Sequence, residues 1–428
     1  MFQQNGLSLD QAPPISVVFR FFFVASLFGI FAGILILIFG KEILSPTSTA
    51  AVILTHTLTL GVMASFMFGA LFQMLPVIAG VVLSSPIKRS WLLQITFILG
   101  TISLLLAFGL GHALFYWIAS VLLTISLLSI IVVMLRKLLV LQFHTASSHG
   151  MILALVSLGF VVLLALYLTA TMAGVTEGTY YESIKHAHYS FGLFGWITLL
   201  IVSISFQVIE MFYVIPPYPY FVSKYLTTTI MALLFSQAVI SLVFTQVCLI
   251  IDILVYLLFI FYAALTLYRL TQRKRPLADA TIWFWRLGMS SLIISMVGVL
   301  ALIFTDSTQL ILFSSIAFSS FALSIVFAMF YKIVPFLTWF HLNSQGYFEA
   351  PMMHEVIHPK TAKKHFWIHL SLMSSLLIAI LLPSLLMLSA LLTMLSFGWV
   401  SYQVIYAHKL YTKIQTTGQK FDMSGMDS

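Results

Sequence analysis

Four histidines stand at or near the start of long apolar segments, where an imidazole side chain is rare. They are His56, His112, His186 and His188. A polar side chain inside a membrane span is costly to bury and commonly serves a function. Imidazole is a frequent ligand of haem iron and of copper. The pattern therefore predicts a haem or another metal near the ends of these segments. For each histidine alone, a hydrogen bond to a neighbouring helix is the alternative.

Two of these histidines, His186 and His188, are separated by a single residue. On a helix such residues point about 200° apart, so the two imidazoles do not readily share one metal. His56 lies about six residues into its own apolar segment, roughly 9 Å below the outer end of that segment. We expect His56 and His188 to be the axial ligands of one b-type haem, and His186 to bind a second haem or copper. His112, at the boundary of its segment, could join a partial copper site.

Small residues accompany these histidines and could leave room for a flat macrocycle. They are Gly61, Gly69, Gly192 and Gly195. Glycine is also common where two spans cross, so this support is weak.

The composition indicates a membrane protein, because 61% of the 428 residues are hydrophobic and only 7% are charged. Apolar runs of about 20 residues suit helices that cross a bilayer. The sequence predicts an all-α integral membrane protein with twelve spans, near 16–39, 50–76, 90–110, 113–135, 149–173, 186–213, 225–245, 247–268, 282–304, 309–332, 366–382 and 384–406. The single cysteine, Cys248, excludes an internal disulfide and the C-x-x-C-H attachment of a c-type haem.

Basic residues set the predicted orientation. With the N-terminus inside, 18 of the 20 Lys and Arg residues lie on the cytoplasmic side, and only Lys41 and Lys185 lie outside. The net charge of +8 therefore reflects topology and gives no evidence for nucleic-acid binding. We expect a multi-pass protein of a bacterial inner membrane, in contact with lipid, with both termini cytoplasmic. The single transmembrane domain, 1–428, would carry a cytoplasmic N-terminus (1–15), a His-rich cytoplasmic loop (333–364) and a cytoplasmic tail (409–428).

A weak internal repeat runs through the chain. The pairs ending in Gln73, Gln207 and Tyr331 close three apolar segments, 134 and then 124 residues apart. Each interval is the length of one four-helix unit. The spacing favours three pseudo-equivalent units of four helices in a ring, and chance similarity among apolar helices is the alternative.

The segment His186-Ala-His188-Tyr-Ser-Phe-Gly-Leu-Phe-Gly195 resembles the haem-ligating H-x-H helix of haem–copper oxidase catalytic subunits. The likeness is greatest to the nitric oxide reductase and C-family oxidase branches. It implies twelve helices in three sets of four, with two haems on opposite faces of the H-x-H helix. It also implies that His56, on the second helix, is the other axial ligand of the low-spin haem. The segment Tyr331–His341 resembles small single-subunit relatives, and the NnrS family is a looser match in size and span count.

This sequence departs from that superfamily in three ways. Its H-x-H pair is on the sixth span, whereas the oxidases carry theirs on the tenth. Its seventh span lacks the adjacent histidine pair of the copper site, and its tenth has no histidine between Thr305 and Phe340. We therefore expect a haem protein without a complete oxygen-reducing centre. Electron transfer, or binding of nitric oxide or oxygen near the periplasmic face, would be its role, with quinol or a soluble cytochrome as electron partner. Whether it is an oxidoreductase enzyme stays open.

A polar route for protons is a further expectation. Glu210, Gln73 and Gln207 lie near the inner ends of two spans. Side chains in such positions also extend to water without any transport role, which is the alternative for the two glutamines.

Two rival functions have their own signals. His354-Glu355-Val-Ile-His358 is formally H-E-x-x-H, the pattern of zinc proteases, and His365 and His369 follow with the same spacing. Flanking prolines confine any helix there to about two turns, which favours a His-rich surface segment. The other rival is a haem-free transporter whose histidines line a proton or metal path.

Overall fold

The computed structural model describes residues 12–242, 245–274 and 279–420, and every regular element in these ranges is a helix. An isolated bridge joins Tyr347 to Lys420. The prediction of an all-α protein is confirmed. Most of the predicted N-terminal segment 1–15, the end of the predicted tail 409–428 and Arg275 lie outside the described residues.

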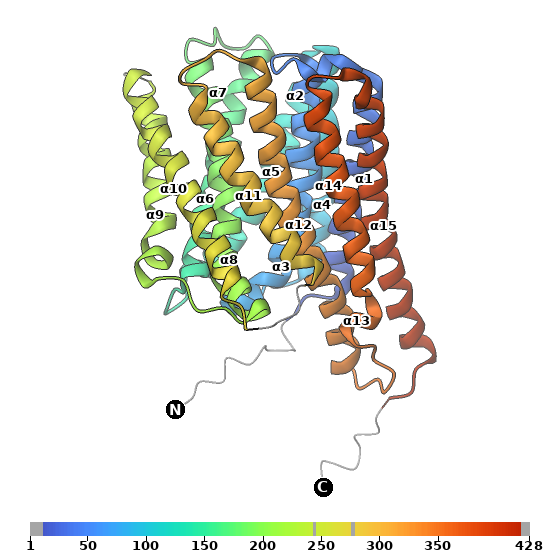
Figure 1. The fold of residues 1–428 in the computed structure, drawn as a ribbon. Helices are drawn as coiled ribbons and strands as arrows, with labels where there is room; N and C mark the ends of the chain where they lie inside the picture. Colours follow the sequence, from blue (N-terminus) through green and yellow to red (C-terminus); the bar gives the residue numbers. More distant parts are fainter. Residues whose placement is uncertain (1–11, 243–244, 275–278, 421–428) are drawn as a thin grey trace.

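The helices follow one another through short connections (Figure 1). The α-helices are α1 (Ile15–Phe39), α2 (Thr49–His56), α3 (Ser65–Ala79), α4 (Pro86–Leu110), α5 (Ala113–Leu139), α6 (Ala146–Met172), α7 (Tyr181–Tyr189), α8 (Leu199–Tyr213), α9 (Tyr220–Ile240), α10 (Thr245–Thr271), α11 (Ala280–Ala301), α12 (Thr308–Ser344), α13 (Met353–Val356), α14 (Pro359–Ala379) and α15 (Leu386–Thr417). Short 3₁₀ segments are η2 (Gly40–Leu44) and η5 (Pro383–Leu385). Two π-helical segments are η3 (Thr57–Ala64) and η4 (Ser190–Thr198).

Ten helical segments in the described ranges are long and apolar enough to cross a membrane. Two more helices, α9 and α14, have 21 residues each and run alongside them (Figure 1). Many large apolar side chains face outward, for example Leu92, Leu99, Val121 and Ile125 on α4 and α5. An apolar outer surface of this kind suits contact with lipid rather than water. The chain is therefore a multi-pass membrane protein.

The long helices lie roughly along one common axis. Both ends of the described chain emerge at the same end of the bundle (Figure 1). We call the opposite end the far end. It carries α2, α7 and the η2 turn, and with them Lys41 and Lys185. The first helix, α1, packs along the last, α15. Gly29 and Gly33, one turn apart on α1, allow this close approach because Phe397 and Met394 of α15 lie against them.

Two of the membrane helices share an unusual construction. In each, a short α-helix at the far end passes into a π-helical segment and then into an α-helix of 15 residues: α2–η3–α3 and α7–η4–α8. The bounds of α3 and α8 are 134 residues apart at both ends, the same interval as between Gln73 and Gln207. His56 directly precedes the first π segment, and His188 lies two residues before the second.

The segment 333–364 differs from the predicted loop. Helix α12 continues through Pro335 to Ser344, because Ile333, Val334 and Leu337 are buried against the bundle. Helix α14 already begins at Pro359, a favourable residue in a first turn. Of the predicted tail, the part up to Thr417 continues α15.

Candidate functional site

His56 of α2 and His188 of α7 lie at the same end of the bundle, the far end. The two imidazoles are near enough to interact electrostatically. They reach this position from segments 132 residues apart in the chain. Both side chains are partly buried, so neither is simply a surface residue.

Each of these imidazoles is held through its Nδ1 atom by a backbone carbonyl. Nδ1 of His56 lies 2.9 Å from the carbonyl oxygen of Val52, one turn earlier in α2. Nδ1 of His188 lies 3.2 Å from the carbonyl oxygen of Val161 on α6. Because a carbonyl only accepts, Nδ1 carries the hydrogen in both rings. The neutral ring then keeps a lone pair on Nε2, which is the arrangement found in histidines that ligate a metal.

The residues around His56 and His188 match in part what a flat macrocycle would need. Phe108 of α4 lies with its ring 4.8 Å from the ring of His56, and Tyr116 of α5 lies behind Phe108. A Cβ atom added at Gly192 would meet only Val161, at 3.8 Å, among the described residues. Gly192 thus leaves open space next to Val161, the residue whose carbonyl holds His188.

The other three glycines serve helix packing instead. A Cβ atom at Gly61 would come within 2.5 Å of Phe28, and one at Gly195 within 2.6 Å of Ser157. Gly69 similarly meets Phe21 and Phe22 of α1. These contacts explain the glycines without a macrocycle, in contrast to the expectation from sequence.

His186 faces away from this pair, as expected for a residue two positions from His188. Its Nδ1 is against the side-chain amide of Gln237 on α9, and its Nε2 lies 3.5 Å from Oδ2 of Asp252 on α10. Tyr189 packs edge-on against the ring, 4.8 Å away. Both ring nitrogens of His186 are therefore occupied by polar neighbours that the sequence analysis did not connect with it.

His112 has a different environment from the other three histidines. It is exposed and stands at the N-terminus of α5, where its Nδ1 accepts a hydrogen bond from the backbone N–H of Leu114 at 3.3 Å. This contact explains the residue as a helix cap. A role for His112 at a metal stays a prediction.

The three residues of the predicted proton route differ in their contacts. Gln73 is buried, and neither of its amide atoms has a hydrogen-bond partner among the described residues. Gln207 is half-buried. Glu210 accepts a hydrogen bond from the backbone N–H of Tyr218 at 3.0 Å and so fixes the loop that leads to α9. Buried amides of this kind normally bind water, which suits a hydrated path at Gln73.

An ion pair joins the N-terminus of α11 to α12. Asp279, which caps α11, lies 2.6 Å from Nζ of Lys332 on α12. Partial burial alone would raise the pKa of the Asp279 carboxyl. The Lys332 ammonium and hydrogen bonds from Thr281 and Ile282 outweigh this effect and hold that pKa below its ordinary value.

The H-E-x-x-H segment is not arranged as a zinc protease site. Helix α13 has four residues, so His354 and His358 do not lie on one continuous helix. Nδ1 of His358 accepts from the backbone N–H of Lys360 and caps α14, and Glu355 accepts from the backbone N–H of Met352. Within the described ranges there is no group of three or more His, Cys, Asp or Glu that could hold a metal ion.

A second histidine pair lies in the interior, and sequence reasoning noted its spacing but missed its burial. His365 and His369, one turn apart on α14, are fully buried. Nε2 of His365 lies 2.9 Å from the hydroxyl of Ser396, and Nε2 of His369 lies 2.9 Å from that of Ser324. Both rings pack on Phe284 and Phe327. The available signal was the helical spacing of His365, His369, Leu372 and Met373, which share one buried face.

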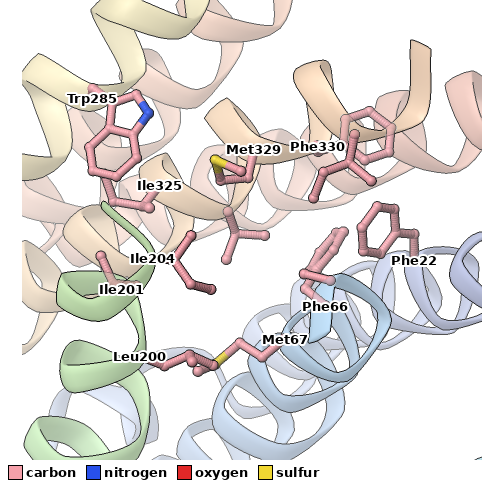
Figure 2. A pocket seen from close by; sticks show the side chains of 13 residues that line it. Phe22, Phe66, Met67, Leu200, Ile201, Ile204, Trp285, Ile325, Met329 and Phe330 are labelled. Carbon is pink, nitrogen blue, oxygen red and sulfur yellow. The ribbon is translucent and has the colours of Figure 1, made fainter. Parts of the chain in front are cut away.

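Two apolar cavities lie in the bundle. The first, of about 60 Å³, is lined by α1, α3, α8, α11 and α12, and every side chain that lines it is hydrophobic (Figure 2). The second, of about 200 Å³, lies between α1, α2, α12, α14 and α15, and its lining includes Thr55, Ser315, Ser319 and Thr393. Apolar cavities of this kind stay dry and accept small apolar molecules.

No protein-family model matches this chain, and no curated protein matches it either.

Proposed function

We propose that this protein binds a b-type haem between His56 and His188 and acts in electron transfer or in binding of a diatomic gas. The observation that carries the proposal is the shared state of the two imidazoles. Each donates its Nδ1–H to a backbone carbonyl and keeps the lone pair of Nε2, and the two rings are near enough to interact electrostatically. Bound haem would supply one-electron chemistry or a gas-binding iron.

The roles of the chain's own residues follow from their contacts. The carbonyl groups of Val52 and Val161 fix the orientation of the two rings and raise the basicity of Nε2. Phe108 and Tyr116 keep water from one side of His56. His186, with Asp252 and Gln237 at its nitrogens, is less suited to a second haem than His188, and a complete haem–copper centre is not part of the proposal.

We further infer twelve membrane passes, in which α9 and α14 join the ten more apolar helical segments. Three units of four helices form a ring in this proposal, supported by the matched bounds of α3 and α8 and by the contact of α1 with α15. With only Lys41 and Lys185 at the far end, that end faces the periplasm of a bacterial inner membrane. Quinol or a soluble cytochrome would then reach the site from that side.

The apolar cavities support gas binding rather than a polar substrate. Nitric oxide and oxygen are small and weakly polar, so they dissolve in lipid and in apolar cavities such as the first one (Figure 2). Gln73 and Gln207 would serve a proton route from the end of the bundle that carries the termini, with Glu210 fixing the adjacent loop.

The test is the reduced-minus-oxidised absorption spectrum of purified protein made with adequate haem supply. We expect a b-type α band in the wild type that disappears in His56→Ala and in His188→Ala, because either change removes one axial nitrogen. His112→Ala is the matched control and should keep the band, since His112 is an exposed helix cap.

The outcomes separate the candidate functions. Wild-type protein without extractable haem contradicts the proposal and favours a haem-free transporter with a histidine-lined path. A band that survives in both His56→Ala and His188→Ala means that haem binds elsewhere, which also contradicts it.

A further inference from the structure

His186 and Asp252 face each other at a separation that a hydrogen bond does not explain well. Nε2 of His186 lies 3.5 Å from Oδ2 of Asp252, beyond the usual 2.7–3.2 Å of an N–H···O bond. Nitrogen and oxygen ligands of one tetrahedral Zn²⁺ stand about 2.0–2.2 Å from the metal, which puts them about 3.4 Å from each other. The observed gap therefore matches two ligands on a common ion.

Gln237 provides a second, independent observation. Its side chain is fully buried against Nδ1 of His186, and its Oε1 has no hydrogen-bond partner among the described residues. A side-chain amide can turn over and present either its NH₂ or its oxygen to the ring. With the oxygen toward the ring, it accepts Nδ1–H of His186 and leaves the Nε2 lone pair directed at Asp252. A buried acceptor that orients a ligating imidazole in this way is typical of metal sites.

The surroundings suit a cation that is open to solvent. The side chains of His186 and Asp252 are 27% and 16% exposed, so water can complete the coordination. The basic residue on the same turn of α7, Lys185, is paired with Glu182. Asp252 thus remains as the negative charge beside His186.

We propose that His186 and Asp252 bind a divalent transition metal ion of the Zn²⁺ class at the far end of the bundle, with Gln237 orienting the imidazole. The site uses the opposite face of α7 from His188 and does not depend on haem at that residue. Mixed nitrogen and oxygen ligands and an open position are the features such ions accept.

The experiment measures Zn²⁺ binding to the full chain in detergent, by competition with a chromophoric chelator. His354→Gln and His358→Gln are introduced first, so that the His-rich segment does not compete for metal. We expect one Zn²⁺ per chain in this background. Asp252→Asn and His186→Gln should each weaken binding more than tenfold, and Gln237→Leu should weaken it about 10- to 100-fold because the orienting contact is lost.

Glu182→Gln is the matched control, since it removes a nearby carboxylate that pairs with Lys185, and it should leave the affinity unchanged. Asp252→Glu keeps an oxygen ligand and should retain part of the binding, which separates loss of a ligand from loss of fold. Equal affinity in the background protein and in both Asp252→Asn and His186→Gln overturns the proposal. So does the absence of stoichiometric Zn²⁺ in the background protein. Neither result bears on the α band expected from His56 and His188.

Discussion

The histidines of this protein differ in which ring nitrogen makes a hydrogen bond and in whether that nitrogen donates or accepts. His56 and His188 donate Nδ1–H to a backbone carbonyl, so Nε2 keeps its lone pair. His112 and His358 use Nδ1 to accept a backbone N–H, which makes them helix caps. His365 and His369 use Nε2 toward a serine hydroxyl inside the bundle, which makes them part of the core. One residue type thus has three roles, set by the neighbour that each ring meets.

The burial of His369 in the core predicts that its loss lowers the stability of the protein. His369→Ala should destabilise the protein by about 2–4 kcal/mol, because it leaves a cavity between Phe284 and Phe327 and removes the partner of Ser324. Thermal unfolding in detergent measures the effect as a lower midpoint. His354→Ala, at an exposed position, is the control and should change the midpoint little. Equal midpoints for the two variants would contradict a core role for His369.

At the scale of the helix, the two π segments position the histidines. A π-helical segment makes room for an extra residue, so it turns everything before it relative to everything after it. Segment η3 sets the direction of His56 relative to α3, and η4 sets that of His188 relative to α8. The same device therefore acts on both sides of the site.

Deleting two residues from η3 tests this positioning. A π segment holds one residue more than the α-helix that would replace it, so loss of one residue alone would keep His56 in register. Removal of both Thr59 and Leu60 should leave a regular α-helix and rotate His56 by about 100° relative to α3. We expect the haem α band to be lost while the helical circular dichroism is retained. Thr59→Ala is the control, because it keeps the residue count, and its spectrum should match that of the wild type. An unchanged α band in the deletion would mean that η3 does not set the direction of His56.

Sequence reasoning predicted the helical class, because apolar length is a local signal, and it placed His56 and His188 toward the same end of the bundle; their joint binding of a haem stays a prediction. It did not reveal the π segments, which carry no residue signature. The burial of His365 was hidden because the face it shares is recognisable only once α14 is known to begin at Pro359. The pairing of His186 with Asp252 depends on how α7 and α10 pack, and no spacing in the sequence encodes that contact.

At the scale of the whole molecule, closure of the bundle depends on α1 lying tightly along α15. A Cβ atom at Gly33 would sit 2.9 Å from the backbone oxygen of Ala390 and 2.6 Å from Cγ of Met394. Backbone cannot move aside as a flexible side chain can. The contact is thus a point where the first and last helices are fitted to each other.

Gly33→Ala should lower stability by about 1–3 kcal/mol through this overlap. Gly398→Ala, on α15, is the control, since a Cβ atom there meets no described atom within 4 Å. It should leave the thermal midpoint unchanged or raise it, because alanine favours a helix more than glycine. A Gly33→Ala protein as stable as Gly398→Ala would show that the two helices are not closely fitted there.

The distance along the chain between His56 and His188 has a consequence for biogenesis. During synthesis the first imidazole enters the bilayer long before the second has been translated, and the carbonyl of Val161 that steadies the second arrives between them. A nascent chain that ends before α7 cannot chelate iron with both nitrogens. Cofactor loading would therefore be a late event, and it would fasten the early-inserted helices to those that follow.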